Sequence, residues 1–302
     1  MTIRTASPAP KPARPLAGVR ILSLALNLPG PAALMRCRTM GATCVKLEPP
    51  APDSGAGDPM ASYAPQAYAA LHAGVRVLRA NLKTEAGQKA LHRELARTDV
   101  LVTSFRPSAL ARLDLGWRKL HKLYPTLSQV AIVGASGERA EEPGHDLTYL
   151  AEHGLVSGLD LPPTLYADMG GSLMASEAVL QAQLLRAAKG RGVFLEVALA
   201  DAAGYLALPR AWGLTAPQGS VGGAHAGYRV YPCQDGRVAV AALEPHFAQA
   251  LCAAAGVADA SRKGMLASAT HEAIAAFLLG RTRRQLERLA IEQDIPLHVL
   301  PA

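Results

Sequence analysis

The chain has 302 residues, half of them hydrophobic and only 5% aromatic, so Ala, Leu and Val must supply most of its core. Its 31 basic and 24 acidic residues give a net charge of +7, but the basic residues are scattered, unlike the concentrated stripe typical of nucleic-acid binding. The four cysteines lack metal-type spacing, and no apolar stretch reaches the roughly 20 residues needed to cross a bilayer. We therefore expect a soluble, cytoplasmic protein with no metal, no nucleic-acid partner and no membrane association.

The chain begins with a Pro- and Ala-rich segment over residues 1–15 that carries no acidic side chain, which is typical of a disordered tail. From residue 16 onward, apolar runs alternate with amphipathic segments. This pattern predicts strands at 19–26, 43–47, 75–82, 100–105 and 128–133, and helices at 32–40, 84–97 and 108–123. Strands alternating with helices predict an α/β fold with a mostly parallel sheet covered on both faces.

Three ionisable side chains stand where a strand or turn leads into a helix. His145 precedes an amphipathic segment, Asp168 is predicted to end a short strand at 164–167, and Glu244 to end another at 238–243. Open α/β sheets bind ligands beyond the carboxyl ends of their strands. An imidazole and a carboxylate that face one carbon from two sides are the groups that proton exchange requires. Taken singly, however, His145 is more typical of a capping or packing residue, and Asp168 and Glu244 are equally typical of an N-cap.

Two further features surround these residues. Asp146, next to His145, is an acidic residue in a first helical turn and is typical of a helix-stabilising charge. Gly170 and Gly171 follow Asp168 and precede a helix predicted from about residue 173. Because glycine lets backbone N–H groups approach a ligand closely, we expect a glycine loop that stabilises a developing oxyanion.

The motifs, in this order, resemble the family III CoA-transferases and, within them, the α-methylacyl-CoA racemases. The resemblance runs from residue 16 to about residue 300. It rests on LAGVRIL at 16–22, GATCVKLEP at 41–49, GHDLTYL at 144–150, YADMGG at 166–171 and ALEPHF at 242–247.

The resemblance implies a large Rossmann-like, CoA-binding α/β domain over residues 16–190, a helical linker over 191–221 and a smaller α+β domain over 222–302. It also implies an interlocked homodimer and an acyl-CoA substrate, with no cofactor beyond the CoA thioester and no metal. In the racemase branch, residues matching His145 and Asp168 are the acid/base pair, and a glutamate matching Glu244 assists them.

Three basic residues match CoA-binding positions of the family, namely Lys46, Arg76 and Arg106. Arg106 follows a predicted strand end, where a planar guanidinium suits phosphate oxygens. Each of the three is also compatible with an ordinary surface charge. The basic pair of the family is reduced here, because Val75 precedes Arg76.

Three functions are consistent with the sequence. The first is an acyl-CoA racemase or epimerase acting on a 2-methylacyl-CoA, favoured by the Gly-His-Asp motif, which the transferases generally lack. The second is a CoA-transferase that works through an acyl-Asp168 intermediate, with His145 as a helix-start residue. The third is a non-catalytic acyl-CoA-binding homologue, because family members continue past the segment in which this sequence ends, at Ala302.

Overall fold

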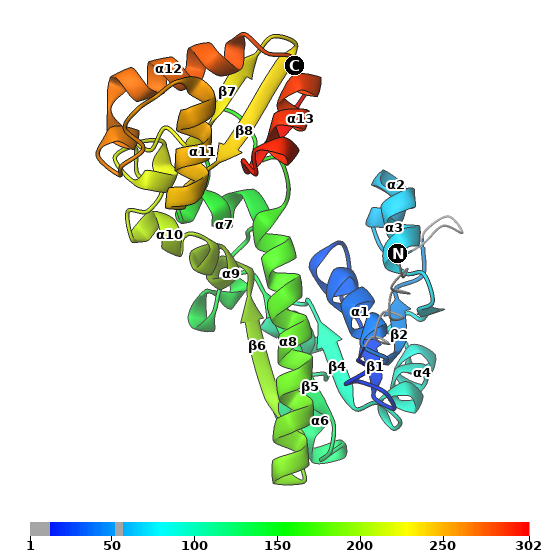
Figure 1. The fold of residues 1–302 in the computed structure, drawn as a ribbon. Helices are drawn as coiled ribbons and strands as arrows, with labels where there is room; N and C mark the ends of the chain where they lie inside the picture. The colour runs from blue at the N-terminus through cyan, green and yellow to red at the C-terminus, as the bar shows by residue number, and fades with distance from the viewer. Residues whose placement is uncertain (1–12, 52–56, 302) are drawn as a thin grey trace. The chain divides into compact units, whose positions relative to one another are not determined.

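The computed structural model describes residues 13–51 and 57–301, which form two compact units that divide after Ala207 (Figure 1). Most of the tail expected over residues 1–15 lies outside the described residues. The segment 191–221, expected as a helical linker, instead supplies strand β6 (Phe194–Ala198) and helix α9 (Leu199–Leu206) to the first unit. Among the described residues, no helix combines the length and apolar composition needed to cross a bilayer.

The first unit is built on a six-stranded sheet in which every neighbouring pair is parallel. Its strand order is β3-β2-β1-β4-β5-β6, so the α/β fold class is confirmed. The direction of winding reverses between β1 and β4, which makes this pair the topological switch point of the sheet. The remaining strands are β1 (Arg20–Ser23), β2 (Thr43–Glu48), β3 (Arg76–Arg79), β4 (Val100–Thr103) and β5 (Ser128–Val133).

Helices cover both faces of this sheet. Successive strand residues point to opposite faces, so Ile21 of β1 packs in one core cluster and Leu22 in the other. The first cluster includes α1 (Pro29–Thr39) and α8 (Tyr166–Lys189). The second includes α4 (Glu85–Leu95), α5 (Pro107–Arg112) and α6 (Trp117–Leu123). The other helices of this unit are α2 (Met60–Tyr63), α3 (Pro65–Leu71), the 3-10 turn η1 (Gly137–Glu141) and α7 (Asp146–Glu152).

Two local predictions differ from the structure. The single helix predicted at 108–123 is divided into α5 and α6, because the chain turns at Asp114, whose φ is +62°. The short strand predicted at 164–167 is wrong, since α8 already begins at Tyr166. The start of the helix predicted at 84–97 is fixed by Thr84, whose side chain accepts a hydrogen bond from the Gly87 N–H at 3.1 Å.

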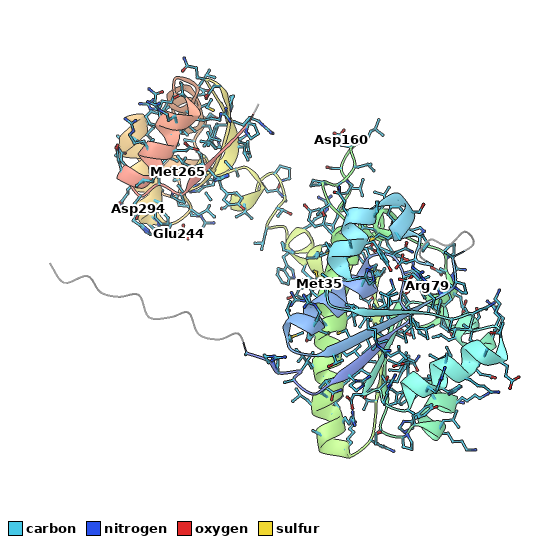
Figure 2. The ribbon with its side chains drawn as sticks, turned by 90° about the vertical axis from the view of Figure 1, so that its right-hand side faces the viewer. Met35, Arg79, Asp160, Glu244, Met265 and Asp294 are labelled. Carbon is cyan, nitrogen blue, oxygen red and sulfur yellow. The ribbon has the colours of Figure 1, made fainter. Side chains whose placement is uncertain are left out.

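The second unit is a smaller α+β body. Its antiparallel sheet has the order β7-β8-β9, formed by β7 (Tyr228–Cys233), β8 (Gly236–Ala241) and β9 (Leu297–Leu300). Helices α11 (Pro245–Ala255), α12 (Ser268–Leu279) and α13 (Arg283–Glu292) pack their apolar sides into one core with this sheet. Met265, labelled in Figure 2, is fully buried there. The unit also contains α10 (Leu208–Ala211) and the 3-10 turns η2 (Ser220–Gly222) and η3 (Gly264–Leu266).

Candidate active site

A cavity of about 260 Å³ lies at the carboxyl ends of β1, β4 and β5 in the first unit. This is the switch point of the sheet, where open α/β folds bind their ligands. The chain segments that follow these strands, together with the beginnings of α7 and α8, line the cavity. Its polar lining residues include Asn27, Ser104, Arg106, His145, Tyr149 and Asp168. The structure thus brings together His145 and Asp168, the two residues that the sequence singled out for proton exchange.

His145 is the N-cap of α7. Its backbone N–H donates to Thr148 Oγ1 at 3.0 Å, and the Thr148 hydroxyl donates to the His145 carbonyl oxygen at 2.7 Å. These hydrogen bonds fix the helix start through the backbone of His145. Because the side chain is exposed and lines the cavity, it is placed for acid/base work.

Asp168 lies in the first turn of α8 and is half-buried. The pKa of its carboxyl group is raised to about 6, mainly by burial and in smaller part by the nearby Asp146 carboxylate, while His145 acts in the opposite direction. A carboxyl group with this pKa has both protonation states accessible near neutral pH, which is what a general acid or base requires.

Asp146 contributes to the site in a way that the sequence reasoning missed. Its side chain is 5% exposed, and its Oδ1 accepts a hydrogen bond from the Asp168 N–H at 3.0 Å. Asp146 therefore ties the start of α7 to the start of α8 and places a negative charge beside Asp168. Its position directly after His145 was the available signal, but the same pattern is typical of a helix-stabilising charge.

Tyr149 explains the glycine of the Gly-His-Asp motif. A Cβ atom placed on Gly144 would lie 2.5 Å from Tyr149 Oη, and one placed on Gly134 would lie 2.3 Å from the same atom. Only residues without a side chain leave room for this phenol, which lines the cavity. Burial raises the pKa of Tyr149, so the hydroxyl remains a proton-bearing donor at neutral pH.

The expected glycine loop is wrong. Gly170 and Gly171 lie inside α8, where the helix directs N–H groups toward its own preceding turn. A Cβ atom on Gly171 would come within 2.3 Å of Leu199 Cδ2, and one on Gly170 within 3.3 Å of Ala202 Cβ. The two glycines therefore allow α8 to pack closely against α9, and they do not form an oxyanion site.

The three candidate CoA-binding residues are not brought together. Arg106 is exposed, stands at the N-cap of α5 and lines the cavity. Arg76 is the first residue of β3, at the opposite end of the parallel strands, and pairs with Glu94 at 2.9 Å. Lys46 is not a surface charge, because its side chain is 0% exposed among buried acidic residues, and its contact with CoA stays a prediction.

Glu244 belongs to the second unit, where it is the exposed N-cap of α11 with Pro245 at the first helical position (Figure 2). The strand-to-helix arrangement predicted around it is therefore confirmed. Its assistance to His145 stays a prediction.

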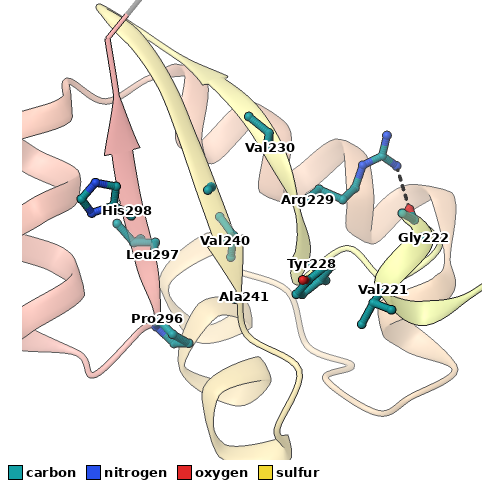
Figure 3. Close-up of a pocket in the computed structure, with 12 residues that line it drawn as sticks. Val221, Gly222, Tyr228, Arg229, Val230, Val240, Ala241, Pro296, Leu297 and His298 are labelled. Atoms are coloured by element: carbon teal, nitrogen blue, oxygen red, sulfur yellow. Dashed lines mark hydrogen bonds between the residues drawn. The ribbon is translucent and has the colours of Figure 1, made fainter. Parts of the chain in front are cut away.

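The second unit contains a concavity of its own, of about 700 Å³, against its sheet (Figure 3). Tyr228, Val230, Leu297 and His298 are among its lining residues, and the Arg229 guanidinium donates to the Gly223 carbonyl oxygen at 3.2 Å. Its lining includes none of the candidate catalytic or CoA-binding residues.

A potential set of metal ligands among the described residues comprises Glu48, Asp58 and His72, whose ligand atoms lie within 4.8 Å of one another. The ammonium group of Lys46 lies among them, 2.9 Å from His72 Nε2 and 3.3 Å from Glu48 Oε1. The chain thus supplies its own cation to this acidic set, which does not fit a divalent ion as long as Lys46 is present.

The doubly wound parallel sheet, with an imidazole and a carboxyl group at its switch point, defines an α/β protein with a site suited to acid/base or nucleophilic chemistry. Residues 16–301 match the model of CoA-transferase family III. The chain belongs to that family.

Curated relatives include both transferases and racemases. The chain is 28% identical over 213 residues to a probable fatty acyl-CoA transferase of Mycobacterium tuberculosis, covering 65% of this chain and 53% of the relative. It is 32% identical over 214 residues to the succinyl-CoA–D-citramalate CoA-transferase of Chloroflexus aurantiacus, covering 66% and 52%. It is 30% identical over 272 residues to the alpha-methylacyl-CoA racemase of Mus musculus, covering 84% and 68%. The chain thus spans about half the length of the first two relatives.

Solved structures show the same fold. A hypothetical protein from Mycobacterium tuberculosis superposes with a TM-score of 0.80 at 23% identity, covering 96% of this chain and 86% of that one. A CaiB/BaiF family protein from Brucella suis gives a TM-score of 0.78 at 23% identity, covering 96% and 85%.

Proposed function

We propose that this protein is an acyl-CoA racemase or epimerase that exchanges the α-proton of a 2-methylacyl-CoA thioester. The observation that carries the proposal is that His145 and Asp168 line one cavity at the switch point of the sheet. The pKa of Asp168, raised to about 6, supports the proposal because a group that alternates between acid and base must change protonation state near neutrality.

The reaction requires one proton to leave the α-carbon and another to return to it from the opposite side. One residue of the pair accepts the α-hydrogen as a proton, and the electron pair of the C–H bond passes into the thioester as an enolate. The other residue then donates its own proton to the opposite face of the carbon. After one turnover the protonation states of His145 and Asp168 are exchanged, so the reverse direction uses the same pair with the roles reversed.

Other groups of the chain support this assignment. The neutral Tyr149 hydroxyl lines the cavity and is a donor for the enolate oxygen. Arg106, at the cavity and exposed, is a partner for a CoA phosphate. Assistance from Glu244, the homodimer and the cytoplasmic location belong to the same proposal.

A CoA-transferase is the second candidate, and the transferase names of several relatives favour it. In that reaction the Asp168 carboxylate attacks the thioester carbonyl carbon, the C–S bond breaks, and CoA leaves as a thiolate while an acyl-Asp168 anhydride forms. His145 then has no role in bond making. A protein that binds acyl-CoA without catalysis is the third candidate.

The deciding experiment follows incorporation of solvent deuterium at the α-carbon of a 2-methylacyl-CoA in D₂O. We expect exchange with the unmodified protein and a loss of about 10²- to 10⁴-fold in each of His145→Ala and Asp168→Asn. Asp160→Asn is the matched control, because Asp160 is exposed and does not line the cavity (Figure 2). Absence of exchange across several acyl chains would refute the racemase, and hydroxylamine trapping of an acyl group on Asp168 would then identify the transferase.

A further inference from the structure

A closed cluster of charged groups lies inside the first unit, around the side chain of Lys46. The side chains of Lys46, Glu48 and Asp58 are all 0% exposed. Lys46 Nζ forms an ion pair with Asp58 Oδ2, lies 2.9 Å from His72 Nε2 and lies 3.3 Å from Glu48 Oε1. A buried ammonium group is costly to leave unpaired, so the fold must supply these partners to Lys46.

The hydrogen bonds of His72 fix its tautomer and determine which of its nitrogens faces Lys46. His72 Nδ1 lies 2.7 Å from the Tyr68 carbonyl oxygen, which can only accept, so Nδ1 carries the hydrogen. His72 Nε2 therefore accepts a hydrogen bond from Lys46, and burial lowers the pKa of His72, which keeps the ring neutral. The ammonium group thus donates to Asp58 and His72 and forms an ion pair with Glu48. The Tyr68 hydroxyl donates to the same Glu48 oxygen, Oε1, at 2.6 Å.

Asp58 connects this cluster to the cavity. The Asn27 N–H lies 3.1 Å from each of the two Asp58 carboxylate oxygens, and the Met60 N–H donates to Oδ1 at 3.0 Å. Asn27 follows β1, lines the cavity together with Asp168, and has a φ of +61°. Asparagine adopts this left-handed conformation more readily than most residues with a side chain, and here the Asp58 carboxylate holds it through the Asn27 N–H.

We propose that Lys46 is a positioning residue for the candidate active site. Its buried ammonium group fixes Asp58, and Asp58 fixes the left-handed backbone of Asn27 at the edge of the cavity. The Tyr63 hydroxyl, which donates to Asn27 Oδ1 at 3.3 Å, is oriented through the same contact. The catalytic consequence of this arrangement rests on the proposed function, whereas its effect on Asn27 does not.

Lys46 is needed to hold Asn27 because it balances the charge of Asp58. With Lys46 present, a buried carboxylate faces a buried cation and accepts hydrogen bonds from two backbone N–H groups. Without the cation, the carboxylate must take up a proton or move toward solvent, because an unpaired buried charge is strongly disfavoured. Either change weakens the hydrogen bonds that hold Asn27.

The test replaces Lys46 by a neutral side chain of similar length, in Lys46→Met. Lys89→Met is the matched control, because the side chain of Lys89 is 72% exposed and forms an i,i+4 pair with Glu85. In Lys46→Met we expect hydrogen exchange at the Asn27 amide, followed by NMR, to accelerate about tenfold or more. We also expect kcat for α-proton exchange to fall by about tenfold to a hundredfold while KM for the acyl-CoA stays within about threefold.

The outcomes separate the proposal from its alternatives. If Lys46 instead contacted CoA, KM would rise while kcat and the Asn27 amide stayed unchanged, which would overturn the proposal. An unchanged Asn27 amide in a folded Lys46→Met protein would overturn it as well. If Lys46→Met does not fold, Asp58→Asn decides by the same two measurements, since it keeps the shape of the side chain and removes its charge. If the unmodified protein shows no α-proton exchange, the proposed function fails, and the Asn27 amide still decides the role of Lys46.

Discussion

The first unit contains two aspartates near the carboxyl ends of its strands whose surroundings are opposite. Asp58 is fully buried, pairs with the Lys46 ammonium group and accepts hydrogen bonds from backbone N–H groups. Asp168 is half-buried beside the Asp146 carboxylate, and its own backbone N–H is bound to that neighbour. One carboxylate is compensated on every side, whereas the other faces a like charge at the wall of a cavity.

This difference distinguishes a carboxylate that holds the structure together from one that can take part in a reaction. A buried carboxylate that is paired with a cation and accepts backbone hydrogen bonds holds the backbone in place. A carboxyl group whose charge is opposed by burial and by a like charge gains and loses a proton near neutrality, which suits it to acid/base work. The two environments predict that neutral substitutions at the two positions change the free energy of unfolding in opposite directions.

The largest change in the free energy of unfolding is expected at Asp58. Asp58→Ala leaves the Lys46 ammonium group buried with a weaker partner set and removes the acceptor of the Asn27 and Met60 N–H groups. Breaking a buried ion pair from one side typically costs about 3–5 kcal/mol, so we expect a loss of this size in urea unfolding at pH 7. A loss below about 1 kcal/mol would contradict the view of Asp58 as a compensated structural charge.

At Asp168 we expect a neutral substitution to raise the free energy of unfolding. Because its folded pKa of about 6 lies above its unfolded value, the folded state takes up a proton more readily, and stability falls as pH rises between the two pKa values. Asp168→Asn removes this cost, so we expect the variant to be more stable than the unmodified protein by about 1–3 kcal/mol at pH 7.5.

Urea unfolding of Asp168→Asn as a function of pH checks the sign. The gain should vanish as pH falls below the unfolded pKa, near pH 4, because both states of the unmodified protein are then protonated. A gain that persists unchanged at low pH would show that packing, and not the charge of Asp168, distinguishes the two proteins. Since the same substitution is expected to abolish exchange, a gain in stability combined with a loss of activity would identify a functional carboxylate.

A smaller effect separates the two causes of the raised pKa at Asp168. Asp146→Asn keeps an oxygen acceptor for the Asp168 N–H but removes the neighbouring negative charge. We expect the pKa of Asp168, measured by ¹³C NMR titration of its carboxyl group, to fall below about 6 and to remain above the ordinary range of an aspartate, because burial is the larger cause. A pKa that returned fully to the ordinary range would show that the like charge, and not burial, dominates.

The parts of the fold that depend on local patterns were predicted well from the sequence. The alternation of buried strands and capped helices predicts the parallel sheet, and His145 is found because it stands at a helix start. The roles of Gly170 and Gly171 were missed, since a glycine pair fits both a loop and a close helix contact. Leu199 and Ala202, which decide between them, lie about thirty residues further along the chain.

Lys46 shows a second limit of sequence reasoning. A lysine in a strand suggests an exposed cation, yet every residue of β2 after Thr43 is buried. Glu48 lies on the same strand, but Asp58 and His72, the other two partners that make burial of Lys46 tolerable, come from other segments. The charge balance of the cluster arises only when Asp58 and His72 meet Lys46 in the folded unit, so the sequence around Lys46 does not predict it.

The smallest change in the free energy of unfolding is expected for an exposed ion pair. It tests whether burial, or contact between the charges alone, determines how much an ion pair contributes to stability. Lys89 Nζ and Glu85 Oε1 lie 2.6 Å apart, closer than Lys46 and Glu48 at 3.3 Å, but the two side chains are 72% and 82% exposed. Water solvates both charges when the pair is broken, so Glu85→Gln should change the free energy of unfolding by less than about 0.5 kcal/mol. Urea unfolding of this variant beside Asp58→Ala gives the comparison directly. A cost above about 1 kcal/mol would mean that contact distance outweighs burial in this protein, and the distinction drawn between Asp58 and exposed carboxylates would then fail.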